Sequence, residues 1–186
     1  MIILRDKSTL LIDFPYLYCM ILQTERLLIK EVSLNHAPFY FELFSDPDFI
    51  KNINDKNLKS VEETEVFLEN TMIPNLCKNG LGFFTVFEKS THTPIGVASL
   101  LKRDQLDALD VGYAFLPKGR GKGYATEATR AVMDYAHTSL QQSKIIAFTM
   151  PKNEASKKVL RNLGFTYVGV KRVYENTEDC LFEYEF

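Results

Sequence analysis

A cationic, glycine-rich octapeptide is the segment of this chain whose residue types most directly suggest chemistry. It follows an apolar, strand-like run, opens a segment with helical periodicity, and reads Lys118-Gly119-Arg120-Gly121-Lys122-Gly123-Tyr124-Ala125. Glycine lets backbone N–H groups approach an anion, and the first N–H groups of a helix have no partner within that helix. The positive end of the helix dipole and the three cations add to this, so the segment predicts a phosphate site. The alternative is a glycine-rich turn whose cations are only solvated.

Two other nucleotide-binding motifs do not fit the octapeptide. A Walker A loop ends in Gly-Lys-Ser/Thr, and no hydroxyl residue follows Lys122 before Tyr124. A Rossmann fingerprint starting at Gly119 would require glycine at position 124 and an acidic residue at the end of the next strand. A dinucleotide enzyme is therefore not expected.

The composition is that of an ordinary globular protein. The 186 residues are enough for one substantial core, and 22 basic against 24 acidic residues give a formal charge of −2. No global field attracts nucleic acid or a membrane surface, so neither is expected as a partner. The three cysteines, Cys19, Cys77 and Cys180, indicate free thiols in a reducing compartment, here the cytoplasm. The histidines lack metal-ligand spacing, so no metal is expected.

Residues 1–22 are apolar-rich, but charged residues and Pro15 interrupt them before they reach the length of a bilayer span. We interpret them as an N-terminal arm or an extra strand packed on the domain or on a second subunit, with Met20 as a conceivable alternative start. Residues 23–186 are expected to form a single domain. Monomer and homodimer both stay open.

Hydrophobic periodicity predicts the element order β-α-α-β-β-β-α-β-α-β-β. Asn35 is expected to cap the first helix, Pro74 to end or kink the second, and residues 46–59 to form a long mobile loop. The strands are expected at 25–32, 82–88, 94–101, 109–116, 144–150, 165–173 and 180–186, and the helices at 37–44, 60–74, from 124 onward and at 153–163.

With this order of elements, three segments resemble the GNAT N-acetyltransferase superfamily, in particular its branch of ribosomal-protein N-terminal (alanine/serine) acetyltransferases. They are Gly121-Lys122-Gly123-Tyr124-Ala125-Thr126-Glu127-Ala128, the run from Asn153 to Phe165, and Thr24-Glu25-Arg26-Leu27-Leu28-Ile29. The resemblance covers Gln23 to Phe186. It implies an α/β (α+β mixed) fold with a GNAT-like central, mostly antiparallel mixed sheet flanked by helices.

The resemblance also implies acetyl-CoA as cosubstrate, with its pyrophosphate on the octapeptide. Lys118 stands where the family usually has Gln or Arg, and lysine lacks the bidentate fork of arginine. By resemblance, a bulge in the fourth strand offers backbone N–H groups to the thioester carbonyl, which points to the run from Tyr113 through Phe115 to Leu116. Asn153 would position the pantetheine arm and Ser156 would bond or protonate the thiolate. Both residues also suit a plain helix cap.

Other cations and carboxylates complete the candidate site. Lys158, with Lys157 and Arg161, could meet the 3′-phosphate or lie on a solvated helix face. Asp110, before Val111-Gly112-Tyr113, is the candidate general base acting through water, or else a solvated aspartate at a strand end. The acceptor amine is expected between the 46–59 loop and the final strand pair. There Asp46, Asp48 and Asp55 could attract a cation, and Phe49 or Tyr174 could line the wall.

These inferences give two functional hypotheses. The first is an acetyl-CoA-dependent N-acetyltransferase that moves an acetyl group to a primary amine, on a protein N-terminus or a small molecule, by direct attack. The second is a catalytically silent acetyl-CoA-binding regulatory module.

Overall fold

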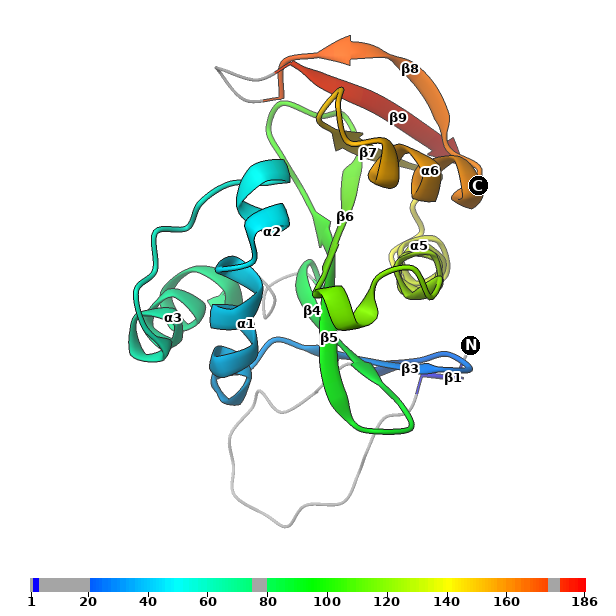
Figure 1. The fold of residues 1–186 in the computed structure, drawn as a ribbon. Helices are drawn as coiled ribbons and strands as arrows, with labels where there is room; N and C mark the ends of the chain where they lie inside the picture. The colour runs from blue at the N-terminus through cyan, green and yellow to red at the C-terminus, as the bar shows by residue number, and fades with distance from the viewer. Residues whose placement is uncertain (1, 4–20, 75–79, 174–177) are drawn as a thin grey trace.

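The computed structural model describes residues 2–3, 21–74, 80–173 and 178–186, which form one mixed sheet with helices on both faces (Figure 1). Within these residues the sheet has nine strands in the order β1-β2-β3-β4-β5-β6-β7-β9-β8. Every neighbouring pair is antiparallel except β6 with β7. The predicted fold class, a mostly antiparallel mixed sheet flanked by helices, is confirmed.

The strands are β1 (Ile2–Ile3), β2 (Ile21–Gln23), β3 (Leu27–Glu31), β4 (Gly82–Glu88), β5 (Thr93–Leu101), β6 (Leu109–Phe115), β7 (Lys144–Thr149), β8 (Thr166–Lys171) and β9 (Asp179–Glu185). The α-helices are α1 (Ala37–Phe44), α2 (Pro47–Asn52), α3 (Val61–Phe67), α5 (Tyr124–Thr138) and α6 (Glu154–Leu163). Short helical turns are η1 (Leu34–His36), η2 (Leu68–Met72, a π-helix) and η3 (Pro117–Gly119).

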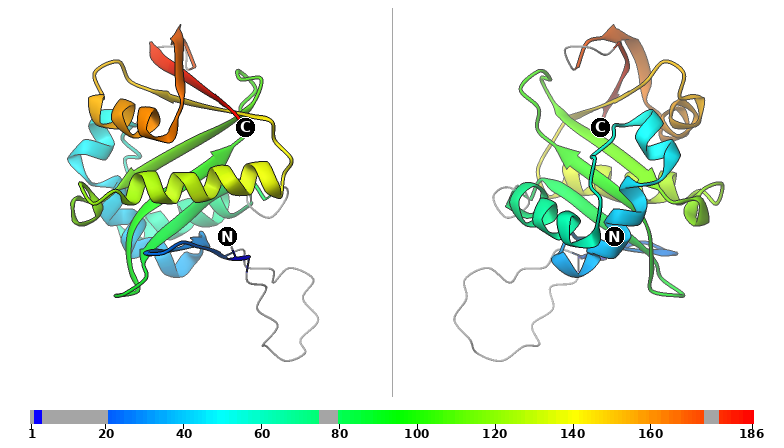
Figure 2. Two further views of the ribbon diagram at one scale, coloured as in Figure 1. Left: turned by 90° about the vertical axis from the view of Figure 1, so that its right-hand side faces the viewer. Right: turned by 60° about the vertical axis from the view of Figure 1, so that its left-hand side comes forward.

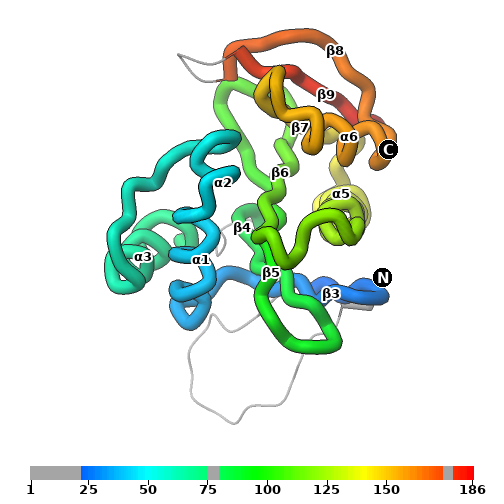
Figure 3. Tube along the Cα trace, in the orientation of Figure 1, coloured from blue at the N-terminus to red at the C-terminus, as the bar shows by residue number. Residues whose placement is uncertain are grey.

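The two faces of the sheet are covered by different helices. Helices α1, α2 and α3 lie on one face, and α5 and α6 lie on the other (Figures 1 and 2). Aromatic side chains pack together in the layer formed by α1, α2 and α3. The centre of the Phe44 ring lies 5.2 Å from that of Phe49 and 5.8 Å from that of Phe67. On the second face α5 buries a stripe of small and apolar residues, including Ala128, Val132 and Ala136, against the sheet. Figure 3 traces the chain through the sheet and the helices in the same orientation as Figure 1.

Three local predictions needed correction or extension. Asn35 lies inside η1 and does not cap α1, whose N-cap position is His36. The capping box formed by Ser33 and His36 starts η1, which leads directly into α1. The predicted loop 46–59 begins with α2, since Asp46 caps that helix by accepting from the backbone N–H groups of Asp48 and Phe49. The second predicted helix, expected at 60–74, is α3 followed by the π-helical turn η2, which comes before Pro74.

At the N-terminal edge, β1 and β2 extend the predicted sheet by two strands, and the expected boundary at residue 22 falls within β2. The rest of the predicted arm, residues 4–20, lies outside the described residues, as do Cys19, Cys77 and Tyr174. Cys180 is a buried free thiol, as expected. In the described part of the chain, none of the helices combines the length and the apolar character needed to cross a lipid bilayer.

Gly96 offers a test of how tightly β5 and β6 pack. Phe115 on β6 is paired with Gly96 on β5. A Cβ added at Gly96 would lie 2.3 Å from the buried Phe115 ring. We expect Gly96→Ala to lower the free energy of unfolding by about 1–3 kcal/mol, the usual range for overpacking a core. Denaturant unfolding of the native protein and of the variant measures this. Unchanged stability in Gly96→Ala would contradict the close packing.

Candidate active site

The parallel strands β6 and β7 part soon after they meet. Their register joins only Leu109 to Ile145 and Asp110 to Ile146, although β6 continues to Phe115 and β7 to Thr149. Along its other edge β6 stays paired with β5 from Asp110 to Phe115 without a register shift. The sheet therefore carries an open edge in its middle, made by the second half of β6.

The register identifies which backbone groups face this open edge. The N–H of Leu116 donates to the carbonyl of Ile95, at 3.0 Å, so this residue directs its backbone groups toward β5. Because hydrogen-bonding direction alternates along an antiparallel strand, Ala114 also faces β5, whereas Tyr113 and Phe115 face the opening. This corrects the predicted run from Tyr113 to Leu116. The N–H of Leu116 is already used, and β6 has no bulge here.

The glycine loop leads from this edge into α5. Gly121 and Gly123 have φ values of +73° and +80°, which side-chain-bearing residues rarely adopt. Gly123 is the N-cap of α5 and supplies no side-chain cap, so the first N–H groups of this 15-residue helix are left for another acceptor. The loop therefore presents backbone donors at a helix N-terminus, an arrangement that suits an anion. Gly119 differs, because it is buried against Ile95 and Phe115.

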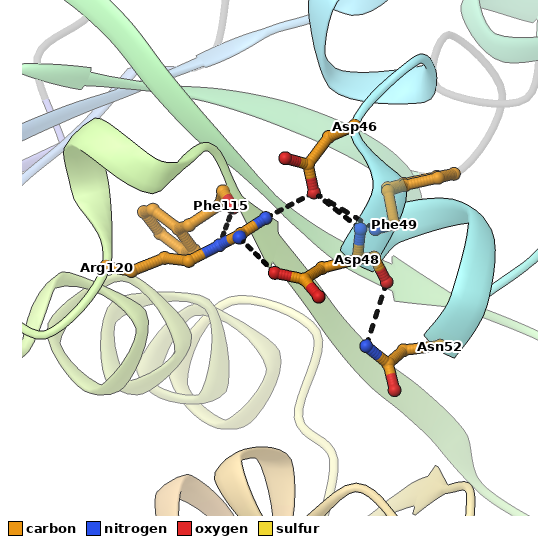
Figure 4. A network of polar contacts seen from close by, with 6 residues as sticks. All are labelled: Asp46, Asp48, Phe49, Asn52, Phe115 and Arg120. Carbon is orange, nitrogen blue, oxygen red and sulfur yellow. Dashed lines mark hydrogen bonds and ion pairs between the residues drawn. The ribbon is translucent and has the colours of Figure 1, made fainter.

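Arg120 does not extend toward the loop's own N–H groups. Its guanidinium bonds Asp46, pairs with Asp48 at 2.5 Å, and donates through Nε to the carbonyl of Phe115 at 2.7 Å (Figure 4). The charge predicted for the phosphate cradle is thus used to fasten α2 to the end of β6. Arg120 balances one of the two carboxylate charges of Asp46 and Asp48. That these aspartates attract a cationic acceptor therefore stays a prediction.

The remaining side chains of the octapeptide have partners as well. Lys118 lies 3.2 Å from Glu42 across an exposed pair. Tyr124 is buried and donates to Glu88 at 2.6 Å, a bond that raises the pKa of the Tyr124 phenol. The Lys122 ammonium lies 5.9 Å from the centre of the Tyr124 ring. Ala125 occupies the first turn of α5, partly buried, where its backbone N–H belongs to the uncapped set.

A pair of hydroxyl groups faces the opening from the helical side. The Tyr113 hydroxyl lies 2.9 Å from the Ser156 hydroxyl and 3.0 Å from the Ser156 carbonyl oxygen, to which it donates. Burial raises the pKa of Tyr113 to about 12, against a smaller opposing effect of the bond to Ser156. Asn153 caps α6 by accepting from the Ser156 N–H at 3.0 Å. The structure thus brings the predicted Asn153 and Ser156 together with Tyr113.

Asp110 lies apart from this pair. It is buried, and its Oδ1 accepts from Arg103 Nε at 2.6 Å. Burial raises the pKa of Asp110, and the nearby Arg103 charge opposes the rise without cancelling it. Asp110 and Tyr113 are three residues apart on one strand, so their side chains point to opposite faces of the sheet. Burial excludes the alternative of a solvated aspartate at a strand end, and the role of Asp110 as a base stays a prediction.

Among the predicted cations of α6, the structure separates Lys157 from Lys158. The Lys157 ammonium bonds the carbonyl of Pro151 and pairs with Glu154 at 2.8 Å, so its charge is used within α6. Lys158 is exposed on the helix surface, and its predicted contact with a 3′-phosphate stays a prediction.

The sequence reasoning missed three residues that hold the loop. Arg26 and Glu127 join the β2–β3 turn to the first turn of α5, and Glu88 anchors Tyr124. Both Arg26 and Glu127 lie inside the segments that carried the family resemblance. Each residue's place in a family motif suggested that it has a role, but nothing in the sequence indicated that the two motifs contact each other.

Solved acetyltransferases share this fold. The structure resembles the GNAT-family acetyltransferase of Bacillus anthracis with a TM-score of 0.75, at 24% identity over 89% of this chain and 98% of that one. It also resembles a ribosomal L7/L12 α-N-protein acetyltransferase solved with coenzyme A, with a TM-score of 0.76 at 18% identity, over 89% of this chain and 98% of that one. At these identities the likeness concerns the fold.

The sequence itself establishes the family. Residues 26–166 match the family described as acetyltransferase (GNAT) domain. The N-acetyltransferase p20 of Bacillus licheniformis is 31% identical over 164 residues, which are 87% of this chain and 91% of the relative. The [ribosomal protein uS5]-alanine N-acetyltransferase of Escherichia coli is 33% identical over 106 residues, 55% of each chain. The chain belongs to the GNAT acetyltransferase family and is an N-acetyltransferase.

The ion pairs of Arg120 can be tested through Asp46. Replacing Asp46 with Ala removes the cap of α2 and a buried partner of Arg120, and we expect it to cost about 1–2 kcal/mol of unfolding free energy. Asp48→Ala, at a side chain 62% exposed, should change stability by less than about 0.5 kcal/mol. Urea unfolding measures both. Equal effects of the two substitutions would contradict the assignment of Asp46 as the fastening residue.

Proposed function

We propose that this protein is an acetyl-CoA-dependent N-acetyltransferase that transfers the acetyl group directly to a primary amine. The observation that carries the proposal is the open edge of β6 beside the uncapped N-terminus of α5. A bound acetyl-CoA would supply a thioester whose carbonyl carbon accepts the amine. The chain's own groups then have three tasks, namely to hold the diphosphate, to stabilise the oxyanion and to move protons.

The donor set suits the diphosphate and the carbonyl. The N–H groups of Gly121 to Ala125 surround the start of α5, where the helix dipole favours negative charge. The N–H groups of Tyr113 and Phe115 face the opening of the sheet and can donate to the carbonyl oxygen as its charge develops. Asn153 holds the start of α6 and keeps an amide group for a polar part of the pantetheine arm.

The hydroxyl pair can deliver the proton that the departing thiolate needs. Ser156 and Tyr113 are 2.9 Å apart, so a proton given up by one hydroxyl can be replaced from the other. The Tyr113 phenol is protonated at neutral pH, as any phenol is, and its raised pKa makes it a weaker acid, so Ser156 is the group that would meet the thiolate. On the other face, Asp110 can take the proton of the amine through water.

A peptide α-amine is the acceptor that the relatives favour. The curated relative from Escherichia coli is named for the alanine N-terminus of a ribosomal protein. A free α-amine has a pKa near 8 and is partly neutral at pH 7, so it demands less of a general base than lysine. Small amines remain the alternative acceptor class. The catalytically silent module is the alternative function, and lack of turnover despite cofactor binding would favour it.

The overall proposal is tested by following release of free thiol from acetyl-CoA in the presence of acceptors. A panel of peptides with free N-termini, the same peptides with blocked N-termini, polyamines and amino acids should be compared. We expect mass increases of one acetyl group on the free-N-terminus peptides. Binding of acetyl-CoA without turnover on any amine would contradict the enzyme hypothesis.

Removal of the Ser156 hydroxyl should slow the chemical step. We expect Ser156→Ala to reduce kcat by about tenfold to a hundredfold, within the range of general acid catalysis, while the KM for acetyl-CoA changes little. Tyr113→Phe should give a smaller loss, because Ser156 keeps its own proton. Initial rates with saturating acceptor measure both. A loss confined to the KM would instead indicate a role in binding.

The role of Asp110 is tested by pH dependence. A base must be ionised, so kcat/KM of the native enzyme should fall as pH drops through the raised pKa of Asp110. Asp110→Asn retains an acceptor for Arg103 but cannot take a proton, so we expect a lower rate and no acidic limb from this group. An unchanged kcat/KM across the pH range would remove Asp110 from the mechanism.

A further inference from the structure

Arg26 contacts the glycine loop from outside, at the turn between β2 and β3. Its Nη1 donates to the carbonyl oxygen of Lys122 at 2.9 Å, and its guanidinium carbon lies 4.7 Å above the centre of the Tyr124 ring. Nε and Nη2 bond the Glu127 carboxylate at 2.7 and 2.6 Å. One side chain thus joins three positions in the loop and the first turn of α5.

The bond to Lys122 fixes the orientation of a peptide group. In a trans peptide the carbonyl of one residue and the N–H of the next point in opposite directions. Because Arg26 holds the Lys122 carbonyl toward the β2–β3 turn, the Gly123 N–H must point away from it, to the other side of the loop. Gly123 has a left-handed conformation that few other contacts constrain, since it is exposed.

The bond to Glu127 controls a charge. This carboxylate lies in the first turn of α5, where it would compete with an incoming anion for the positive helix end. Burial acts to raise its pKa, but bonds from Thr24 at 2.6 Å, from the Arg26 N–H at 3.0 Å and from the guanidinium outweigh this and lower the pKa. Glu127 is therefore ionised and paired with Arg26.

We propose that Arg26 is a positioning residue for the coenzyme A site. It orients the Gly123 N–H toward the diphosphate and neutralises Glu127, and it acts through the loop without touching the ligand itself. The inference rests on the proposed function, because it takes the α5 N-terminus as the diphosphate site. It assigns a role to the Thr24-Glu25-Arg26 motif, which the catalytic proposal leaves unused.

The test compares Arg26→Gln with Arg26→Lys in the full chain, with calorimetric titration of coenzyme A as the main measurement. Lysine keeps the charge but cannot bond Lys122 and Glu127 together. Positioning predicts that both variants bind coenzyme A about tenfold more weakly, the loss expected for one charge-assisted bond. Direct contact with phosphate predicts that Arg26→Lys binds nearly as well as the native protein, and that result would overturn the proposal.

Three further measurements separate positioning from misfolding and from indirect effects. Arg172→Gln, at an exposed arginine beyond β8, is the matched control and should bind coenzyme A normally. Nuclear magnetic resonance of the ligand-free protein should show altered Gly123 and Lys122 amide signals in Arg26→Gln while the signals of β4 and β5 stay in place. Adding Glu127→Gln to Arg26→Gln should restore part of the lost affinity, because it removes the carboxylate charge that Arg26 no longer balances.

The outcomes also distinguish the two proposals. If the native protein does not bind coenzyme A, the proposed function fails. If the native protein binds and the Arg26 variants bind equally well, only the role of Arg26 fails. Loss of signals across the whole sheet would show that Arg26 supports the fold generally, which also contradicts a role confined to the loop.

Discussion

The parting of two parallel strands is the constraint on which the rest of the structure depends. β6 and β7 share only two register pairs, so the second half of β6 has backbone groups that no strand satisfies. An unpaired strand edge inside a sheet is costly unless something else accepts its hydrogen bonds. Arg120 satisfies the Phe115 carbonyl, and we propose that the N–H groups of Tyr113 and Phe115 donate to the ligand. Residues at this edge and in the following loop contact the surrounding helices. Arg120 bonds the start of α2, Arg26 pairs with the first turn of α5, and Tyr113 bonds α6.

The fold could be read from the sequence because its signals are local. Strands β4 to β7 and helices α5 and α6 have clear periodicity, and glycines mark the ends of both helices, Gly123 before α5 and Gly164 after α6. Helix α2 was missed because its six residues carry few apolar positions, and its stability comes from the Asp46 cap and from Arg120, which lies 74 residues away. Strands β1 and β2 were expected only as an arm or one extra strand within residues 1–22, without bounds, because such short strands carry almost no pattern of their own.

The site was predictable in its residues but less so in its contacts. The loop, Asn153 and Ser156 were found from motifs, because backbone geometry and helix capping follow from local spacing. The directions of long side chains were not. Arg120 and Asp110 have partners that tertiary structure supplies, and a sequence motif gives no sign that Arg120 turns toward α2 or that Asp110 is buried against Arg103. Tyr113 was expected to act through its backbone alone, while its hydroxyl also meets Ser156.

The ion pairs of the loop have a consequence for the medium in which it works. Arg120 has Asp46 and Asp48, Lys118 has Glu42, and Arg26 has Glu127, so the loop's surroundings carry their own counter-charges. Little mobile salt needs to be displaced when an anion arrives, and attraction at long range is weak. Recognition then depends on oriented peptide dipoles at contact distance, which dissolved ions screen poorly. If the loop binds coenzyme A as proposed, its selectivity depends more on the positions of these peptide groups than on the net charge of the loop.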